Sequence, residues 1–326
     1  SMDVPVLQTM EEFYSGGHSA DLALVVSPAH FHVPQSLEAL AHGSCVLCDK
    51  PMCATLKEAD RFIRAAEQSD SWVMIGYQWS CSSAVLQLKQ DILNGCYGYP
   101  LKARTVCLWP RGFGYYRRNN WAGRISTDAG IPVYDSPASN AAAHFLHNLL
   151  FLLGRSLTGS TRPAGIDTRL YRAYQIENFD TISCRIRTTA GCDIFFHSSH
   201  VTEKPLNPAF EIDFSSGRVY LTSDQKDIIG IDSEGNTVHY GDPDRDQFRK
   251  LRDAVAWSGK SYKPVCGPKT ARPHTEAVSL IQKHADAVTS FPAPLVRRDK
   301  ERIWIDTLYE QFLGCWQEDR LLEIKT

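Results

Sequence analysis

The sequence predicts an α/β domain followed by an α+β domain, with a parallel sheet first and then a large, mostly antiparallel open sheet. Up to about residue 95, short continuous apolar runs alternate with segments of helical periodicity, which is typical of a parallel sheet covered by helices. From Leu101 onward, strand-like runs follow one another across short turns, as in antiparallel sheets. A length of 326 residues suits about two domains, and we expect residues 1–98 and 99–326 to form them.

The first domain is expected to contain three buried strands joined by helices. The strand candidates are short apolar runs that end at turn-forming residues. Thr55 and Glu58 form a capping-box pattern at the start of the helix before the third strand. The strands are 21–27, 45–48 and 72–76, and the helices are 9–14, 31–42, 56–68 and 84–94.

The second domain is expected to be rich in strands with helices at its end. A strand at 101–109 leads into a loop at 110–130 that is rich in Arg, Gly and Tyr. Short turns separate the strands that follow the helix at 135–154. These strands are 181–187, 192–201, 209–214 and 218–221, and the later helices are 242–257, 273–287 and 301–313.

The stretch 135–154 carries the signals for both ends of a helix. Asp135 or Ser136 can cap the first turn, and Pro137 suits the first helical position, where its missing N–H would be unsatisfied anyway. Gly154 is expected to end the helix in the left-handed conformation.

A polar stripe runs along this otherwise apolar helix. Asn140, His144 and either His147 or Asn148 recur every three or four residues, so they share one face. A buried helix with such a stripe either satisfies polar groups within the core or lines a site. Three alanines directly before His144 leave room for a ligand, which favours a site.

Composition excludes several classes of function. The net charge of −2 gives no electrostatic footprint for nucleic acid or an acidic membrane, and the apolar runs are shorter than the ~20 residues that span a bilayer. Ten cysteines without regular spacing indicate reduced thiols and a cytoplasmic location. Cys45, Cys48 and Cys53 admit a zinc site, but the first two lie on a predicted buried strand, so we expect no metal.

Polar residues follow the first two predicted strands, at the edge where ligands of open α/β sheets bind. Lys50 is the strongest candidate for a site residue among them. It lies between Asp49 and Pro51 at the carboxyl end of the second predicted strand rather than on a helix surface. Tyr77 and Trp79 directly follow the third strand, where they either form the floor of a pocket or pack between the domains.

The order of these motifs resembles that of the Gfo/Idh/MocA oxidoreductase family, over nearly the whole chain. The family has Glu-Lys-Pro where this chain has Asp-Lys-Pro. The resemblance implies a Rossmann-type first domain and hydride exchange between a sugar or cyclitol and NAD or NADP. The matching motifs are Pro28-x-x-x-His32, Asp49-Lys50-Pro51, Gly76-Tyr77, Asn120-Trp121, the His144 helix and the segment 241–248.

The resemblance implies catalytic roles for Lys50, His144 and Asn140. Lys50 would bond the reacting hydroxyl and orient the nicotinamide, while His144 would accept the proton, since an imidazole titrates near neutral pH. The family usually has an aspartate where this chain has Asn140, four residues before the histidine. An amide orients an imidazole but does not stabilise its cationic form, so Asp135 is a candidate to compensate.

The cofactor implied by the resemblance is NAD or NADP. The family's strand–GxGxxG–helix unit has no counterpart ahead of Val4, so roughly 50–60 residues of the pattern are absent. We attribute this to a start part-way through the gene product or to a misassigned start codon, and we expect this polypeptide to bind NAD(P) very weakly or not at all. The expected cofactor contacts are Ser27, Pro28, His32, Asp49, Lys50 and Tyr77.

The substrate implied by the resemblance is a small carbohydrate-like molecule. Arginine and tryptophan in the loop at 110–130 suit charged hydrogen bonds and stacking with a sugar. The candidate substrate contacts are Arg117, Arg118, Trp121, Asp135, His147 and His200. Two alternatives stay open: a redox-assisted glycosidase or lyase that retains its nicotinamide, and a non-catalytic sugar sensor. The open sheet, which the family commonly pairs across a dimer, predicts a homodimer or homotetramer.

Overall fold

Three short parallel strands form the first sheet, as predicted. In chain order the elements are α1 (Met10–Ser15), β1 (Leu22–Val25), α2 (Ala29–Ala41), β2 (Cys45–Cys48), α3 (Leu56–Gln68), β3 (Val73–Ile75), a 3₁₀ turn η1 (Gln78–Cys81) and α4 (Ser83–Leu93). The computed structural model describes residues 6–324, and its first sheet has the order β1-β2-β3.

The expectation that all three strands are buried on both faces holds for β2 and β3 but is wrong for β1. Leu24 and Val26 are 49% and 77% exposed. On the face of the sheet that carries Leu22 and Leu24, the apolar cluster around Trp72 packs against Leu22 but leaves Leu24 exposed to solvent. No strand of residues 6–324 pairs with the outer edge of β1.

A nine-stranded sheet dominates the second part of the chain. Its strands are β4 (Pro100–Leu108), β5 (Pro163–Arg172), β6 (Thr181–Thr188), β7 (Asp193–Ser199), β8 (Leu206–Phe214), β9 (Gly217–Leu221), β10 (Ile228–Asp232), β11 (Thr237–Gly241) and β12 (Thr289–Ser290). Their order is β11-β10-β9-β8-β4-β7-β6-β5-β12. The β4–β7 and β5–β12 pairs are parallel and the others antiparallel, so the sheet is mostly antiparallel, as predicted.

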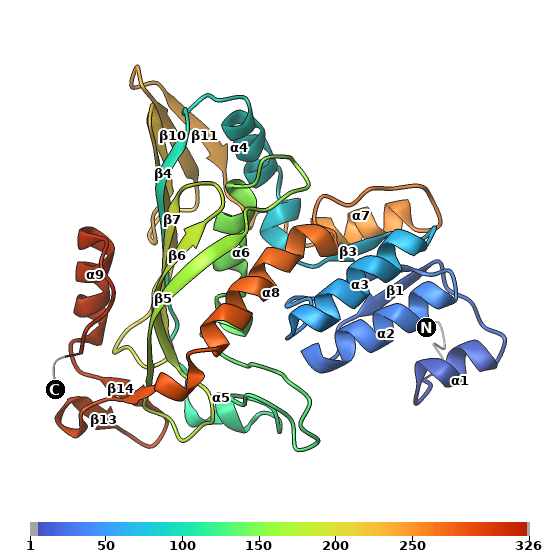
Figure 1. Cartoon of the computed structure of the whole chain (residues 1–326), viewed down its shortest axis with the longest axis horizontal. Coiled ribbons are helices and arrows are strands. Elements are labelled where there is room, and N and C mark those ends of the chain that lie inside the picture. The colour runs from blue at the N-terminus through green and yellow to red at the C-terminus, as the bar shows by residue number, and fades with distance from the viewer. Residues whose placement is uncertain (1–5, 325–326) are drawn as a thin grey trace.

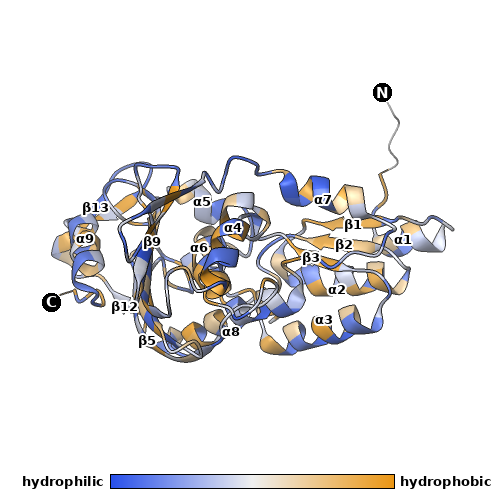
Figure 2. Cartoon of the chain, turned by 90° about the horizontal axis from the view of Figure 1, so that it is seen from above, coloured by the Kyte–Doolittle hydropathy of each residue, from blue (hydrophilic) through white to orange (hydrophobic). Residues whose placement is uncertain are grey.

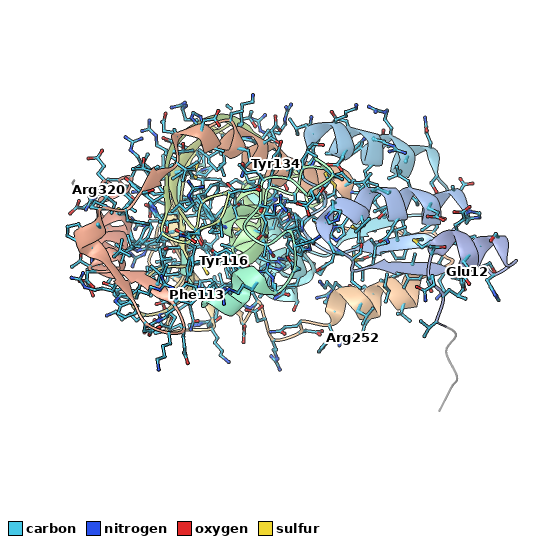
Figure 3. The ribbon with its side chains drawn as sticks, turned by 90° about the horizontal axis from the view of Figure 1, so that it is seen from below. Glu12, Phe113, Tyr116, Tyr134, Arg252 and Arg320 are labelled. Atoms are coloured by element: carbon cyan, nitrogen blue, oxygen red, sulfur yellow. The ribbon has the colours of Figure 1, made fainter. Side chains whose placement is uncertain are left out.

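Helices and a small ribbon cover the two faces of this sheet (Figure 1). The remaining elements are α5 (Phe113–Arg117), a π-helical turn η2 (Pro137–Ala141), α6 (Ala143–Leu152), α7 (Arg249–Trp257), α8 (Pro268–Gln282), the 3₁₀ turns η3 (Ala285–Ala287) and η4 (Ala293–Leu295), β13 (Val296–Arg298), β14 (Ile303–Ile305) and α9 (Leu308–Glu318). In Figure 1, α4, α6 and α8 lie on the side that faces the first sheet, and α9 lies on the other side. Figure 3 shows Glu12 of α1 and Arg320, just beyond α9, at opposite ends of the molecule.

The outer face of the large sheet is partly covered by the chain itself. Ile305 and Phe312 form an apolar cluster there with Val106 and Leu108 of β4. Nearby, Arg104 forms ion pairs with Glu211 of β8 at 2.7 Å and with Asp319 at 2.9 Å. The expected self-association through this sheet stays a prediction, and the surface it would use is charged.

The C-terminal half of the chain returns to the first sheet, whose strands are strongly hydrophobic (Figure 2). The N–H of Ile75 donates to the carbonyl of Cys266 at 2.7 Å, which covers the outer edge of β3. Ala254 of α7 joins the apolar cluster around Trp72. The domain boundary at residue 98 stays a prediction. Residues 249–271 belong to the second predicted domain but pack against the sheet of the first.

Three of the later helices begin at other residues than expected. The predicted helix 242–257 starts only at Arg249, because the Asp244 N–H donates to the Asp242 side chain at 2.8 Å in a turn. α8 starts at Pro268, a residue suited to the first helical position. The predicted helix 301–313 is wrong at its start, because residues 303–305 pair with β13. β5 and β10 to β14 were not predicted from the sequence.

The stretch 135–154 is not one continuous α-helix. Ser136, rather than Asp135, caps the π turn, and its Oγ accepts from the Ser139 N–H at 3.3 Å. The Ala142 N–H then donates to the Pro137 carbonyl, five residues earlier, at 2.8 Å. α6 follows as an almost entirely buried helix.

Gly154 does not have the left-handed conformation that we expected. A Cβ at this position would instead overlap the carbonyl oxygen of Gly159. Buried Lys89 donates to that same oxygen at 2.5 Å and to the Phe151 carbonyl at 2.6 Å, so it ties the end of α6 to the following loop. The glycine is required for this close approach of two backbone segments.

We expect Gly154→Ala to destabilise the fold by about 1–3 kcal/mol, because the added methyl group must displace the Gly159 backbone from Lys89. Denaturant unfolding measures this. Gly114→Ala is the control, since a Cβ there meets no atom within 4 Å and it should change stability by less than about 0.5 kcal/mol. Equal stabilities of the two variants would contradict the close-packing argument.

Candidate active site

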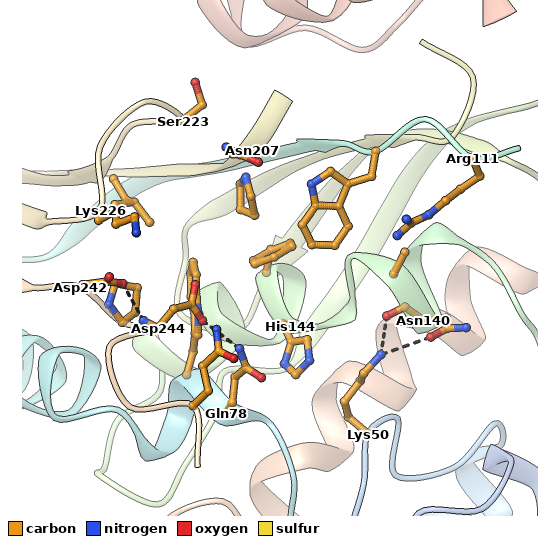
Figure 4. A pocket seen from close by; sticks show the side chains of 18 of the residues that line it. Lys50, Gln78, Arg111, Asn140, His144, Asn207, Ser223, Lys226, Asp242 and Asp244 are labelled. Atoms are coloured by element: carbon orange, nitrogen blue, oxygen red, sulfur yellow. Dashed lines mark hydrogen bonds between the residues drawn. The ribbon is translucent and has the colours of Figure 1, made fainter. Parts of the chain in front are cut away.

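A cavity of about 930 Å³ lies where the end of the first sheet meets the inner side of the large sheet (Figure 4). Lys50, Gln78 and Trp79 reach it from the first domain, and the other side chains come from the second part of the chain. These are Trp109, Arg111, Tyr115, Arg118, Trp121, Asn140, Ala141, His144, Phe145, Asn207, Pro208, Leu221, Ser223, Asp224, Gln225, Lys226, Asp242, Pro243, Asp244 and Gln247.

A second pocket, of about 310 Å³, adjoins the first and shares Lys50, Trp121 and Asn140 with it. It lies at the carboxyl ends of β1 and β2, the edge predicted from the sequence. The predicted residues Ser27, Pro28, His32, Asp49 and Lys50 all line it, as does Asp135.

Lys50 connects the two parts of the chain. Its Nζ donates to the Asn140 carbonyl at 2.7 Å and lies 3.2 Å from the Asn140 Oδ1 (Figure 4). Burial lowers the pKa of Lys50, and the carboxylates of Asp49 and Asp135 oppose this effect. The lysine is therefore held by neutral oxygen atoms, close to carboxylates but in direct contact with none.

Asn140 links Lys50 to the buried carboxylate of Asp135. The Asn140 Nδ2 donates to Asp135 Oδ1 at 2.8 Å, and the Gly123 N–H donates to Asp135 Oδ2 at 2.6 Å. Burial raises the pKa of Asp135, while these two hydrogen bonds and the nearby Arg118 lower it. The negative charge nearest to the Asn140 side chain is thus that of Asp135, one side chain further from Lys50.

His144 projects into the cavity between Gln78 and Lys50 (Figure 4). Its Nδ1 is buried and has no hydrogen-bond partner within residues 6–324. Burial lowers the pKa of His144 well below its usual value, and the positive charges of Lys50 and Lys250 lower it further. The imidazole is therefore neutral at neutral pH and able to accept a proton.

The two other histidines and the tyrosine behind His144 support α6 from outside both pockets. His147 stacks on Tyr77 with ring centroids 3.8 Å apart, and its Nε2 lies 3.0 Å from the Ser80 hydroxyl. The Tyr77 hydroxyl lies 2.9 Å from Nδ1 of His274, whose Nε2 contacts the Ala138 carbonyl at 3.0 Å. The structure thus does not place Tyr77 and His147 where the sequence analysis expected cofactor and substrate contacts.

The loop residues divide between two surfaces. Arg118 and Trp121 line the cavity, and Arg118 lies 3.8 Å from Asp135 and over the Tyr115 ring at 3.7 Å. Arg117 points elsewhere, into a separate surface groove where it lies over Phe113. His200 is buried beside the Tyr116 hydroxyl, 2.8 Å away, and does not line the cavity. Figure 3 labels Phe113 and Tyr116 in this region of α5.

Arg111 and Tyr115 of this loop also line the cavity and were not predicted from the sequence. They precede the predicted Arg118 at helical spacing, and α5 covers residues 113–117 between Arg111 and Arg118. That periodicity was the available signal, and it favours Arg118 over Arg117. Trp109, directly after β4, and His30, in the small pocket, carried no such signal.

Acidic residues line the opposite end of the large cavity. Asp244 Oδ1 accepts hydrogen bonds from Gln78 Nε2 at 2.8 Å and from Trp79 Nε1 at 2.9 Å. Asp242 and Lys226 lie nearby (Figure 4), and Asp224 also lines the cavity. This segment includes 241–248, which the sequence analysis matched to the family but expected to be helical.

Comparison with known proteins gives partial sequence matches. Residues 1–77 match the family described as "Oxidoreductase family, NAD-binding Rossmann fold". D-xylose 1-dehydrogenase [NADP(+)] of Haloarcula marismortui is 35% identical over 95 residues, 28% of this chain and 26% of that protein. Inositol 2-dehydrogenase of Burkholderia ambifaria is 28% identical over 156 residues, 46% of this chain and 42% of that protein. The matches thus span about a quarter and two fifths of these curated relatives.

Solved structures confirm the fold over most of the chain. An oxidoreductase from Thermotoga maritima superposes with a TM-score of 0.67 at 16% identity, over 86% of this chain and 81% of that one. The WlbA dehydrogenase from Bordetella pertussis, in complex with NADH and UDP-GlcNAcA, gives 0.68 at 17% identity over 86% and 82%. In the described part of this chain, every helix is too short or too polar to cross a membrane.

We expect Lys50→Met to raise the pKa of His144. The substitution removes the positive charge that lowers this pKa more than any other neighbouring charge does. The pKa should stay below the usual histidine value, since the ring remains buried. Histidine NMR titration measures this shift, with His144→Gln to assign the signal. Lys226→Met, at the other end of the cavity, should leave the His144 pKa unchanged, and an equal shift in both variants would contradict the argument.

Proposed function

Since this chain belongs to the Gfo/Idh/MocA oxidoreductase family, we propose that it is an NAD(P)-dependent dehydrogenase of a sugar, cyclitol or related polyol. The observation that carries the proposal is the meeting of Lys50 and His144 at one cavity, although they lie on different domains. A buried lysine and a neutral imidazole are the groups needed to bind a hydroxyl and remove its proton. The matched relatives act on xylose and inositol, which agrees with a polyhydroxylated substrate.

The residues of the small pocket fit the nicotinamide end of the cofactor. The pocket lies at the carboxyl ends of parallel strands, where α/β proteins bind nucleotides, and opens beside Lys50. His30 lines this pocket, and its Nδ1 is buried with no hydrogen-bond partner within residues 6–324. This nitrogen is therefore available to hydrogen-bond with a polar group of a ligand. Ser27 and Asp49 supply further polar groups, whereas both ring nitrogens of His32 already contact backbone carbonyls, of Pro51 at 2.7 Å and Ser27 at 2.8 Å.

The proposed reaction uses Lys50 and His144 in different roles. When bound, the nicotinamide supplies the acceptor for the hydride that leaves the carbinol carbon. Lys50 donates a hydrogen bond to the reacting oxygen and stabilises its developing negative charge. His144 accepts the hydroxyl proton, so the alcohol loses a hydride and a proton and becomes a ketone. The reverse reaction uses the protonated histidine as the acid.

Asn140 and Asp135 position Lys50 in this proposal. Asn140 presents two oxygen atoms to the ammonium group, and its amide is itself fixed by Asp135. The Asp135 charge favours the ammonium form of Lys50 against the effect of burial. Plain dehydrogenase chemistry is therefore compatible with an asparagine at position 140.

We expect turnover to depend on pH through these two groups. Activity should fall as pH falls through the pKa of His144, which is well below 6.5, because the base becomes protonated. It should also fall as pH rises through the pKa of Lys50, which is below 10.5, because the ammonium is lost. Initial rates of NAD(P)H formation, measured with a panel of sugars and inositols at millimolar cofactor, test this.

Variants at both positions separate the proposal from its alternatives. Lys50→Met and His144→Gln should each lower kcat by about 100-fold or more, and His144→Gln should remove the acidic limb of the profile. Substrate consumption without net NAD(P)H formation would instead indicate a glycosidase or lyase that retains its nicotinamide. Sugar binding without any turnover in the unsubstituted protein, at a cofactor concentration that titration shows to saturate the site, would indicate a sensor.

We also expect the polypeptide 1–326 to bind NAD(P) in the millimolar range or more weakly. Within residues 6–324, no glycine-rich turn from a strand into a helix precedes β1, and such a turn holds the pyrophosphate in dinucleotide-binding domains. NAD and nicotinamide mononucleotide should therefore bind this polypeptide equally. Titration calorimetry compares them, and micromolar affinity for NAD with a clear preference over the mononucleotide would overturn the expectation.

A further inference from the structure

Arg111 has an unusual position for an arginine that lines a partly buried cavity. It follows β4, and Figure 4 shows its guanidinium group directed into the cavity on the side of Asn140 and Lys50. Its Nε is buried and has no hydrogen-bond partner within residues 6–324. No carboxylate of the described residues forms an ion pair with it.

Aromatic rings hold the Arg111 side chain in place. The guanidinium carbon lies 4.9 Å from the centroid of the Tyr115 ring and 5.6 Å from that of Trp109. These contacts stabilise the cation but give its N–H groups no acceptor. The buried Nε–H is an unsatisfied donor, and such a donor is costly unless a ligand supplies the acceptor.

The neighbouring cations make the same end of the cavity electropositive. Arg118 and Lys50 line it together with Arg111. Of the two carboxylates near Lys50, Asp135 already accepts from Asn140 and Gly123 and lies 3.8 Å from Arg118, while Asp49 lines the adjoining small pocket. The opposite end carries Asp242 and Asp244 with Lys226 (Figure 4), and Asp224 also lines the cavity. The cavity therefore has a cationic end and an acidic end.

Resting on the function proposed above, we infer that Arg111 binds a carboxylate of the substrate, which is therefore an acidic sugar such as a uronic or aldonic acid. The guanidinium presents parallel N–H donors that match the two oxygens of a carboxylate. The acidic residues at the other end of the cavity suit the hydroxyl groups of the same molecule, because carboxylates accept hydrogen bonds from them.

A carboxylate fits this end of the cavity better than a phosphate ester. Phosphate sites commonly use several backbone N–H groups at the N-terminus of a helix in addition to cationic side chains. The helix next to Arg111 is α5, which has only five residues. The recognition here comes from side chains, with one planar guanidinium held between aromatic rings.

Equilibrium binding without cofactor tests the inference independently of turnover. The probes are D-glucuronate, D-galacturonate and D-gluconate, compared with D-glucose, D-galactose and D-glucose 6-phosphate, and calorimetry or the fluorescence of Trp109 and Trp121 reports binding. We expect at least one acid to bind about 10- to 100-fold more tightly than its neutral counterpart. Arg111→Met should remove this preference and change the affinity for neutral sugars less than about threefold, while Arg111→Lys should restore it only in part.

The matched control is Arg298→Met, which removes an arginine that also lies over an aromatic ring, Phe113 at 5.0 Å, but outside the cavity. It should leave the preference for acids unchanged, and circular dichroism checks that every variant is folded. Equal affinities for acids and neutral sugars, a preference that survives Arg111→Met, or a stronger preference for the phosphate ester would each overturn the inference while leaving the dehydrogenase proposal intact. If no sugar of either kind binds or is turned over, the proposed function fails as well.

Discussion

The contact between the Lys50 ammonium group and the Asn140 carbonyl is the constraint on which the site depends. It joins a loop at the end of β2 to the π turn before α6, and it buries a cation between the first sheet and α6. Asn140 from the π turn and His144 from α6 both line the cavity, while the rest of the helix packs into the core. π-Helical turns are frequently found at functional sites.

The charges around Lys50 explain how an asparagine can serve at position 140, where the resemblance implied an aspartate. A carboxylate at position 140 would meet Lys50 directly, whereas here the carboxylate of Asp135 acts through the intervening amide. This separation weakens the attraction between the lysine and its counter-charge. The ammonium group is therefore available to a substrate oxygen while still being favoured over the neutral amine.

The strand ends and the His144 helix were predictable from the sequence because they depend on local patterns. Apolar runs and the motif Asp49-Lys50-Pro51 were enough to place the small pocket. The π turn was not predictable, since Pro137 and the alanines suit an α-helix equally well. Arg111 and His30 were missed for another reason. Their importance lies in hydrogen-bond partners that they lack in the fold, and a sequence does not show which side chains remain unpartnered.

The exposed edge of β1 has a consequence for the solution behaviour of this polypeptide. Leu24 and Val26 lie open beside backbone groups that no other strand of residues 6–324 pairs with, and such an edge is a template for a strand of a second molecule. The outer face of the large sheet instead carries charged pairs such as Arg104 with Glu211. Association through that face weakens as salt screens the charges, whereas association through the apolar edge does not. Particle size as a function of ionic strength therefore distinguishes a specific assembly from the onset of aggregation.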